Sequence, residues 1–163
     1  MVIAFAEMIM TDNVPDLLRQ HGSTRLALIA ESFKRLLGRD LVEPTPDIAQ
    51  ALWSAPRVIV AHAREDDPIF FFGNRWALER FEISAQEFIA MPSRLSAEAL
   101  AREERQRLLQ RVSDHGFIDD YAGVRISARG KRFKIEEAIV WNLLDSDGHV
   151  HGQAATFTHW TDL

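Results

Sequence analysis

The last third of the chain constrains the fold most, because from Phe117 onwards it contains little besides strand and turn patterns. The stretch RFKIEEAIVWNLL (132–144) is long, rich in β-branched and aromatic residues, and apolar at nearly every second position. The glycine turns ARGK (128–131) and DSDG (145–148) flank it on either side. Three antiparallel strands joined by two hairpins are therefore predicted for residues 117–160.

The first two thirds indicate helices interrupted by two short strands. Apolar residues recur at helical spacing in residues 24–37, between the capping residue Ser23 and the terminating Gly38. The apolar runs RVIVAH (57–62) and IFFFG (69–73) predict buried strands. This order of elements predicts an α+β fold, with a five-stranded antiparallel sheet, helices on one face and an N-terminal helical extension.

Length, charge and cysteine content bound the domain organisation and the function classes. The 163 residues suit one domain, which we divide into an extension (1–22), flanking helices (23–56) and a core (57–163). The net charge of −5 argues against a nucleic-acid partner. The absence of cysteine excludes disulfides, thiolate catalysis and cysteine zinc sites. No apolar run reaches the roughly 20 residues that span a bilayer, so we expect no membrane partner and a cytoplasmic location.

Four stretches of the sequence carry a resemblance to a known family. Residues 67–88, DPIFFFGNRWALERFEISAQEF, resemble the part of a PAS domain in which a strand ends at Asn and a short helix begins. Residues 116–127 (GFIDDYAGVRIS), 130–148 (GKRFKIEEAIVWNLLDSDG) and 155–160 (ATFTHW) resemble the PAS-like MEKHLA family more narrowly. The resemblance covers approximately residues 25–163.

The resemblance implies a PAS-like fold with a sensory or protein-interaction role. MEKHLA domains stand at the C-terminus of plant class III homeodomain–leucine zipper regulators, and stand-alone bacterial versions exist. Because this chain contains neither a homeodomain nor a heptad zipper, it is similar to a stand-alone version. A fold by itself does not fix a function, so the chemistry has to be judged from individual residues.

The predicted strand 132–144 supplies the main candidates for a ligand pocket. Trp141, with Ile139 and Phe133, is either core filler or the wall of a cavity. Asn74 is expected to cap a helix and is a further candidate, as a donor at the pocket rim. At period two, the apolar residues that share one face of this strand are Phe133, Ile135, Ile139, Trp141 and Leu143.

Glu137 interrupts that apolar face, and Arg125 lies on the preceding predicted strand. A turn near residues 129–130 places Arg125 opposite Phe133–Ile135, with Glu137 as a diagonal neighbour. A buried charge needs a partner, so Arg125 and Glu137 form either a structural ion pair or an anchor for a ligand. A one-residue bulge would instead turn Glu137 towards solvent.

Tyr121 and His115 are the remaining pocket candidates. Tyr121 follows two acids, but adjacent acids on a strand point in opposite directions, so a solvated start of the strand is favoured over an acid–base dyad. His115 follows Val112 by three residues and can face inwards, where it would be able to ligate haem; alternatively, it is a cation at a helix C-terminus. Photochemistry of the LOV type, which attaches flavin to a cysteine, is excluded, whereas non-covalent haem or flavin remains open.

The hairpin after the long strand contains His149 and His151, which share a face at a spacing of two. Such a pair can chelate zinc or copper only with further ligands, for which His115 and His159 are candidates. A calcium loop is excluded, because Gly148 follows Asp145 after three steps and no glutamate stands at the twelfth position. Two solvated histidines at a hairpin turn are the favoured interpretation.

Three functions remain open from the sequence. The first is a non-catalytic sensory or interaction module that binds a small apolar or aromatic ligand between sheet and helices, with a homodimer through the N-terminal helices. The second is a small enzyme that uses Tyr121, Glu137 or His115 as acid–base groups. The third is a dimerisation or scaffold domain without a ligand. The absence of any recognised catalytic signature favours the first.

Overall fold

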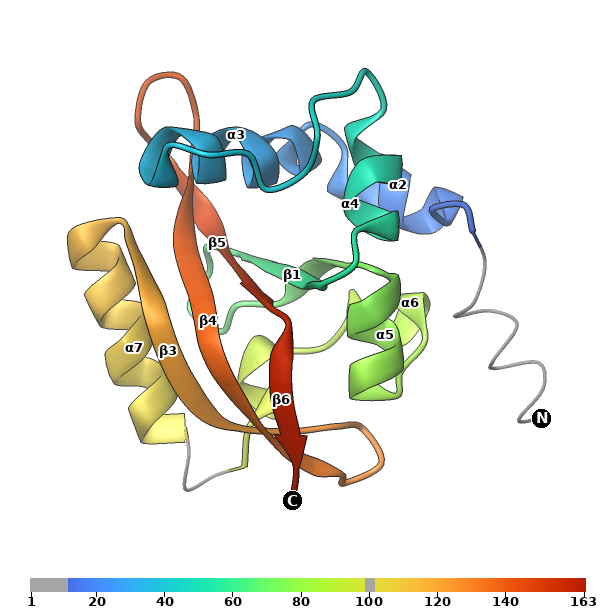
Figure 1. Ribbon diagram of the computed structural model, residues 1–163, viewed down its shortest axis with the longest axis vertical. Helices are drawn as coiled ribbons and strands as arrows, with labels where there is room; N and C mark the ends of the chain where they lie inside the picture. The colour runs from blue at the N-terminus through green and yellow to red at the C-terminus, as the bar shows by residue number, and fades with distance from the viewer. Residues whose placement is uncertain (1–11, 99–101) are drawn as a thin grey trace.

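The computed structural model describes residues 12–98 and 102–163. It confirms the predicted α+β fold, in which helices surround one sheet (Figure 1). In chain order the elements are α2 (Asp16–Gly22), α3 (Arg25–Leu37), α4 (Ile48–Ser54), β1 (Val58–Ala63), β2 (Phe70–Gly73), α5 (Arg75–Phe81), α6 (Ala85–Phe88), the 3-10 turn η1 (Ser93–Ser96), α7 (Arg102–His115), β3 (Phe117–Ile126), β4 (Arg132–Leu144), β5 (Val150–Phe157) and β6 (His159–Asp162).

The strands form one antiparallel sheet in the order β2-β1-β5-β4-β3, and β6 also pairs with β4. Strand β6 pairs with Phe133–Glu136, and β5 pairs with Ile139–Leu144, so the two lie end to end along one side of β4. The sheet therefore has six strands and not the predicted five. The predicted last strand is interrupted at Thr158, close to Glu137 on β4.

Glu137 changes the side-chain alternation of β4. Its φ of 53° lies in the left-handed region, and its side chain is 78% exposed. Ile135, Ala138 and Val140 all face one cavity, whereas strict alternation would separate the first from the other two. This Glu137 bulge confirms the alternative in which the carboxylate turns to solvent. The predicted single apolar face is wrong beyond it, because three side chains turn to the opposite face: Ile139, Trp141 and Leu143.

Helix α3 covers the face of β4 that carries Trp141. The indole packs edge-on against Phe33, with 4.9 Å between ring centroids, and its Nε1 donates to the Ile29 carbonyl at 3.1 Å. On the other face, Asn142 Nδ2 donates to the Val112 carbonyl of α7 at 3.1 Å. The N-terminal helix α3, which was predicted to flank the core, therefore covers the second face, because the bulge turns apolar side chains of β4 away from α7 and α3 buries them.

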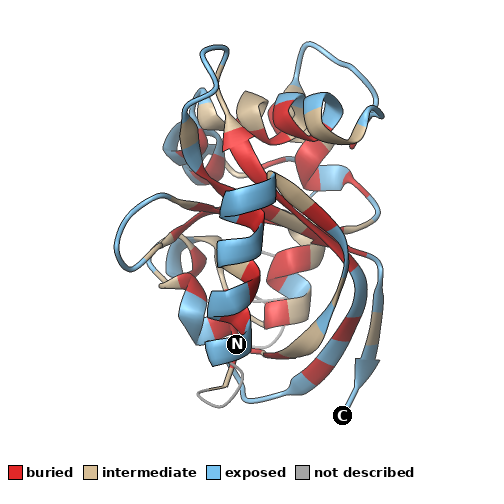
Figure 2. Cartoon of the chain, turned by 90° about the vertical axis from the view of Figure 1, so that its left-hand side faces the viewer, coloured by how far each residue is buried: buried red, intermediate tan, exposed pale blue. Residues whose placement is uncertain are grey.

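The apolar side of α3 is buried against the rest of the chain. Leu26, Ile29 and Phe33 are buried in the same core as Trp141. The apolar face of residues 24–37 is thus covered and cannot serve the predicted homodimer, which remains a prediction only for the exposed faces of α2 and α3. Figure 2, turned by 90°, shows α7 in front of the sheet with its outer side exposed and much of the sheet behind it buried.

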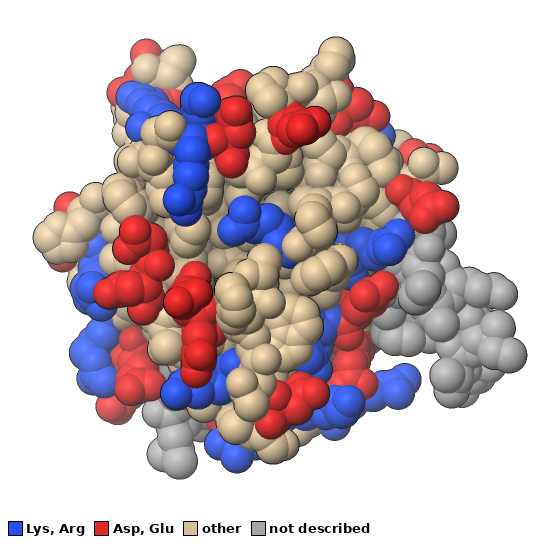
Figure 3. All heavy atoms as spheres, viewed as in Figure 1, with Lys and Arg blue, Asp and Glu red and all other residues tan. Residues whose placement is uncertain are grey.

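No helix in residues 12–98 and 102–163 has both the length and the hydropathy required to cross a bilayer. On the face shown in Figure 3, acidic and basic side chains of the described residues are interspersed.

Replacing Glu137 with glycine is expected to raise the free energy of unfolding by about 1 kcal/mol, because the left-handed backbone strains a residue with a Cβ atom but not glycine. The side chain contributes little in return, since its contact with His159 Nδ1 at 3.7 Å is solvent-exposed. Urea denaturation measures the change. The matched control is Glu136→Gly on the same strand, where glycine should lower stability by about 0.5–1 kcal/mol; a loss at both positions would contradict the bulge.

Candidate functional site

A cavity of about 60 Å³ lies between the inner face of the sheet and α7. Residues of β1, β3, β4 and β5 line it from the sheet side, and residues of α5, α7 and β2 complete its lining. Its apolar lining includes Phe70, Phe81, Leu108, Ile135, Val140 and Phe157. Its polar lining consists of His62, Ser96, Arg105, Tyr121, Arg125 and Gln153. This combination of an apolar wall with a few convergent polar groups is typical of ligand sites.

Two arginines contribute buried positive charge to this cavity. Arg105 on α7 and Arg125 on β3 are each 8% exposed. Arg105 Nη2 donates to the Ser93 hydroxyl at 2.6 Å. Arg125 Nη2 donates to the Tyr121 hydroxyl at 2.8 Å, and its Nη1 donates to the Val124 carbonyl at 2.9 Å. Across the described part of the chain, neither arginine belongs to an ion pair.

The electrostatic cost of this arrangement appears in the pKa of Arg105. Burial, followed by the charge of Arg125, lowers that pKa to about 10. The phenol of Tyr121 and the carboxylate of Asp67 act in the opposite direction but do not cancel the effect. The Arg105 guanidinium still carries its charge at neutral pH, because this pKa lies well above 7.

His62 is the fourth titratable group of the cavity wall, after the two arginines and Tyr121. It is 9% exposed, and burial lowers its pKa to about 4, so the ring is neutral at pH 7. Its Nδ1 lies 3.0 Å from the Ala63 carbonyl. A carbonyl only accepts, which assigns the proton to Nδ1 and leaves Nε2 as an acceptor. At neutral pH the described lining therefore carries two positive charges and no negative charge.

An outer groove of about 390 Å³ adjoins the cavity. The groove lies between the turn that follows β1 and the outer side of α7, and four residues line both spaces: His62, Arg105, Leu109 and Gln153. Gln153 Nε2 donates to the Asn142 side chain at 3.1 Å and to the Leu109 carbonyl at 3.3 Å, which ties the sheet to α7. Arg105 thus stands at the boundary between groove and cavity.

Only some of the sequence-predicted residues meet at this cavity. Tyr121 and Arg125 line it, and Phe133 packs behind the lining residue Phe81, with 5.4 Å between ring centroids. Trp141 and Ile139 lie on the opposite face, because of the Glu137 bulge. The expected pair of Arg125 with Glu137 is wrong for the same reason, since the carboxylate is exposed while the guanidinium is buried.

Asn74 and His115 also lie away from the cavity lining. Asn74 is fully buried, and its side-chain oxygen accepts from the amides of Ala77 and Ile59, at 3.1 and 3.0 Å, so it caps α5 as predicted. Its Nδ2 donates to two carbonyls, which leaves the side chain wholly occupied by structural bonds. His115 is exposed at the end of α7, which excludes the alternative in which it faces inwards to ligate haem and agrees with its alternative position at a helix C-terminus.

The sequence interpretation missed His62 and Arg105, although a signal for each was present. Arg105 stands three residues before Leu108 and seven before Val112, which places it in the apolar stripe of α7. His62 continues the alternation of Val58 and Val60 on β1, and both Val60 and His62 face the cavity. In each case a polar residue occupied an inward position, which calls for a partner or a ligand.

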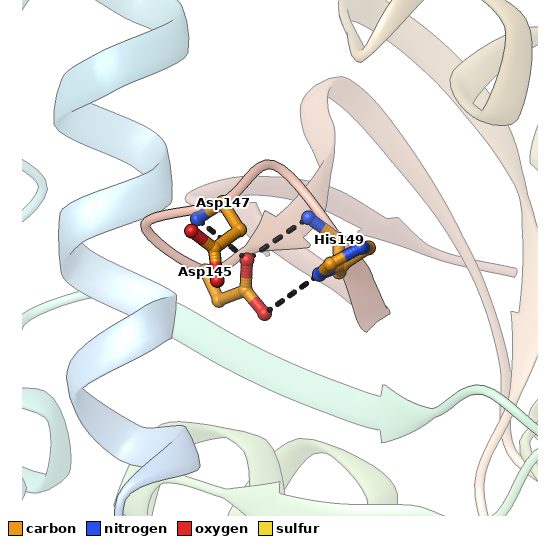
Figure 4. A group of neighbouring side chains, drawn as sticks. All are labelled: Asp145, Asp147 and His149. Carbon is orange, nitrogen blue, oxygen red and sulfur yellow. Dashed lines mark hydrogen bonds and ion pairs between the residues drawn. The ribbon is translucent and has the colours of Figure 1, made fainter.

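The hairpin between β4 and β5 is organised by Asp145 (Figure 4). Its Oδ1 accepts from the amides of Asp147 and His149, both at 2.9 Å, and its Oδ2 accepts from His151 Nε2 at 2.8 Å. The bond from His151, followed by that from the His149 amide, lowers the pKa of Asp145 to about 2. These bonds, with Gly148 at a φ of 84°, confirm the predicted turn.

A metal role for this hairpin was the less favoured alternative from the sequence, and the structure does not test it. Asp145, Asp147 and His149 have potential ligand atoms within 4.8 Å of one another, and His149 and Asp147 are exposed. Within the described residues this group includes neither His115 nor His159, which were the expected further ligands. Exposed acidic turns commonly exist without a metal, and the hydrogen bonds of Asp145 account for the conformation.

Comparison with known proteins agrees with the fold. A family model described as the MEKHLA domain matches residues 23–162. The homeobox-leucine zipper protein HOX9 of Oryza sativa subsp. indica is 24% identical over 137 residues, which cover 82% of this chain and 16% of that protein. This chain therefore spans less than a fifth of the length of the curated relative.

Two solved structures share the architecture. The PAS domain of a Colwellia psychrerythraea protein has a TM-score of 0.57 at 15% identity, over 71% of this chain and 92% of that chain. The PAS domain of a LuxR-family transcriptional regulator from Burkholderia thailandensis, solved in complex with ethanol, has a TM-score of 0.52 at 18% identity, over 69% and 94%. These likenesses show a PAS-like fold, and the family match over residues 23–162 shows that the chain belongs to the MEKHLA domain family.

Proposed function

We propose that this MEKHLA domain is a regulatory sensor that binds a small molecule in the cavity between the sheet and α7. The observation that carries the proposal is a small, mainly apolar cavity whose wall includes two buried arginines, a neutral histidine and a tyrosine. The mainly apolar wall agrees with the expectation of a ligand with an apolar body. Binding of ethanol by the PAS domain from Burkholderia thailandensis supports a ligand of only a few atoms for this fold.

The size of the cavity argues against the larger cofactors. Sites for drug-sized ligands measure about 300–1,000 Å³, whereas this cavity has a volume of about 60 Å³. Haem and the flavin ring system would both require the surrounding side chains to move apart. The residues present therefore do not fit either group, and the ligand we propose is much smaller.

The enzyme alternative finds no assembled site. As a MEKHLA domain with a PAS-like fold, the chain is a non-catalytic module, as predicted. Of the three proposed acid–base groups, Tyr121 lines the cavity, whereas Glu137 and His115 are exposed outside its lining. A general acid and base must lie within hydrogen-bond reach of one substrate, and these three groups do not.

Native mass spectrometry of the full chain, purified from its own host, tests the proposal. We expect the wild-type protein to retain a small molecule. The variant Ala155→Leu, which places a larger side chain in the cavity lining, should lose it. The matched control Ala122→Leu adds the same side chain at an exposed position of β3 and should keep it. An empty wild-type protein that carries a bound partner chain would instead favour the scaffold alternative.

A further inference from the structure

The charge balance of the cavity points to the chemical class of its ligand. Arg105 and Arg125 are more than nine-tenths buried, and their described hydrogen bonds go to neutral groups: the hydroxyls of Ser93 and Tyr121 and the carbonyl of Val124. A buried charge without a counter-ion is costly. Two like charges that face one cavity raise that cost, and the Asp67 carboxylate of the adjoining groove offsets only part of it, so an anion inside the cavity would relieve the remainder.

The remaining donor capacity of the two arginines fits a carboxylate. A guanidinium has five N–H donors in a planar fork that matches a carboxylate. The bonds described above use one N–H of Arg105 and two of Arg125. The Tyr121 hydroxyl, which already accepts from Arg125, has its own proton left to donate. No other charged residue lines the cavity among the described residues.

The rest of the cavity selects against a fully polar anion. Phe70, Phe81 and Phe157, together with aliphatic side chains, form most of the remaining wall. Inorganic phosphate or sulfate would place charged oxygens against this wall, which costs free energy because those oxygens gain no hydrogen bonds there. A carboxylate with a short apolar body satisfies both ends at once, and the volume of about 60 Å³ limits that body to a few carbon atoms.

We propose that the cavity binds a short-chain organic carboxylate, with the carboxylate held by Arg105 and Arg125 and the apolar body against the phenylalanines. This inference rests on the proposed function and adds the class of ligand to it. The groove shared by His62, Arg105 and Gln153 is the access path in this proposal; its three acids, Glu65, Asp66 and Asp67, lie outside the cavity lining, and Arg105 is the one of the two arginines that lines both spaces. The ligand neutralises the charge that the empty cavity leaves without a counter-ion.

Isothermal titration of the full chain tests the ligand class with defined probes. Propionate and butyrate are each compared with their neutral isosteres, propionamide and butyramide, and with inorganic phosphate. Because hydrogen bonds to charged groups are worth more than neutral ones, the acids should bind about 10- to 100-fold more tightly than the amides. Ala155→Leu should abolish the binding of the acids, which assigns it to the cavity.

Variants of the arginines give the second arm of the test. Arg125→Gln and Arg105→Gln should each weaken propionate binding about 10- to 100-fold. The control Arg111→Gln, at an exposed position of α7, should leave binding unchanged. Removal of one buried charge should also leave the melting temperature of the unliganded protein unchanged or higher. If one variant fails to fold, the other variant and the comparison of acid with amide still decide the question.

The outcomes separate this inference from the proposed function. Amides that bind as tightly as acids, and in a manner blocked by Ala155→Leu, would overturn the carboxylate inference and leave a small-molecule sensor standing. Binding of phosphate but not propionate would overturn it as well. If no probe binds and the protein from its host retains no molecule, both proposals fail.

Discussion

Replacing Trp141 with alanine is expected to lower the free energy of unfolding by about 4 kcal/mol, within the range for deletion of a buried aromatic side chain. Trp141 is fully buried, its ring packs edge-on against Phe33, and its Nε1 donates to the Ile29 carbonyl. The substitution removes a ring contact and a hydrogen bond between β4 and α3 and leaves a cavity on the face away from the ligand site. Urea denaturation followed by circular dichroism measures the loss.

Two further variants sharpen this prediction. Trp76→Ala removes the same side chain from a half-buried position, where Trp76 meets Trp160 at 6.1 Å between ring centroids, and should cost less than half as much. Trp141→Phe keeps most of the packing but loses the donor, and should cost about 1–2 kcal/mol. An equal loss for Trp141→Ala and Trp76→Ala would contradict the position of α3 on this face. Because Trp141 lies outside the cavity, Trp141→Phe should also leave propionate binding unchanged.

Lowering the pH from 7 to 4 is expected to destabilise the protein by about 3 kcal/mol through His62 alone. Burial lowers the pKa of His62 in the folded protein to about 4, from an ordinary value of 6.5. Between these two values the unfolded chain binds a proton that the folded chain does not, so protons favour unfolding. The stability is complete above pH 6.5, declines as the pH falls through this window and levels off below about pH 4.

The variant His62→Gln isolates this contribution. It removes the titrating ring, so its stability should vary with pH by about 3 kcal/mol less than that of the wild type between pH 7 and pH 4. Burial also lowers the pKa of His21, which adds a smaller effect of the same sign in both proteins. The control His159→Gln changes an exposed histidine and should keep the wild-type dependence. An unchanged pH dependence in His62→Gln would show that His62 is accessible to protons in the folded state.

The sequence predicts much of this fold because its local signals agree with one another. The glycine turns at 128–131 and 145–148, the capping residue Asn74 and the strand propensity of residues 132–144 all act over short distances, and the structure confirms each of them. The PAS-like character and the family follow from the same stretches. These features depend on the chemistry of neighbouring residues and not on distant contacts.

Which face of the sheet each side chain of β4 occupies depends on contacts with residues distant in the sequence, and the local pattern did not predict it. Period two favoured one continuous apolar face, while the competing bulge depended on which face of the strand another element would cover. The structure resolves this through α3, which lies more than 100 residues away in the sequence and bonds to Trp141. Because Glu137 adopts a positive φ, Trp141 faces α3 and not the cavity. The cavity therefore lies on the opposite side of β4 from the predicted pocket wall.

The cavity residues that were missed share one cause. Arg105 lies in a helix rich in Glu and Arg, where a charged residue normally indicates an exposed face, and His62 ends an otherwise apolar run. Their burial becomes visible only when the spacing of Leu108 and Val112 on α7 is combined with the alternation on β1. Polar residues at inward positions are thus the sequence signal for this site. They indicate the position of a pocket better than the aromatic residues do, because aromatic residues also fill an ordinary core.

Methyl chemical-shift mapping by NMR during a titration with propionate tests the account most directly, because it distinguishes the two faces of the sheet in one measurement. The cavity methyl groups of Leu108, Ile135 and Val140 should shift with a common dissociation constant, and those of Ile139 and Leu143, on the face covered by α3, should remain in place. Shifts confined to Ile139 and Leu143, or the absence of any saturable shift, would contradict the account.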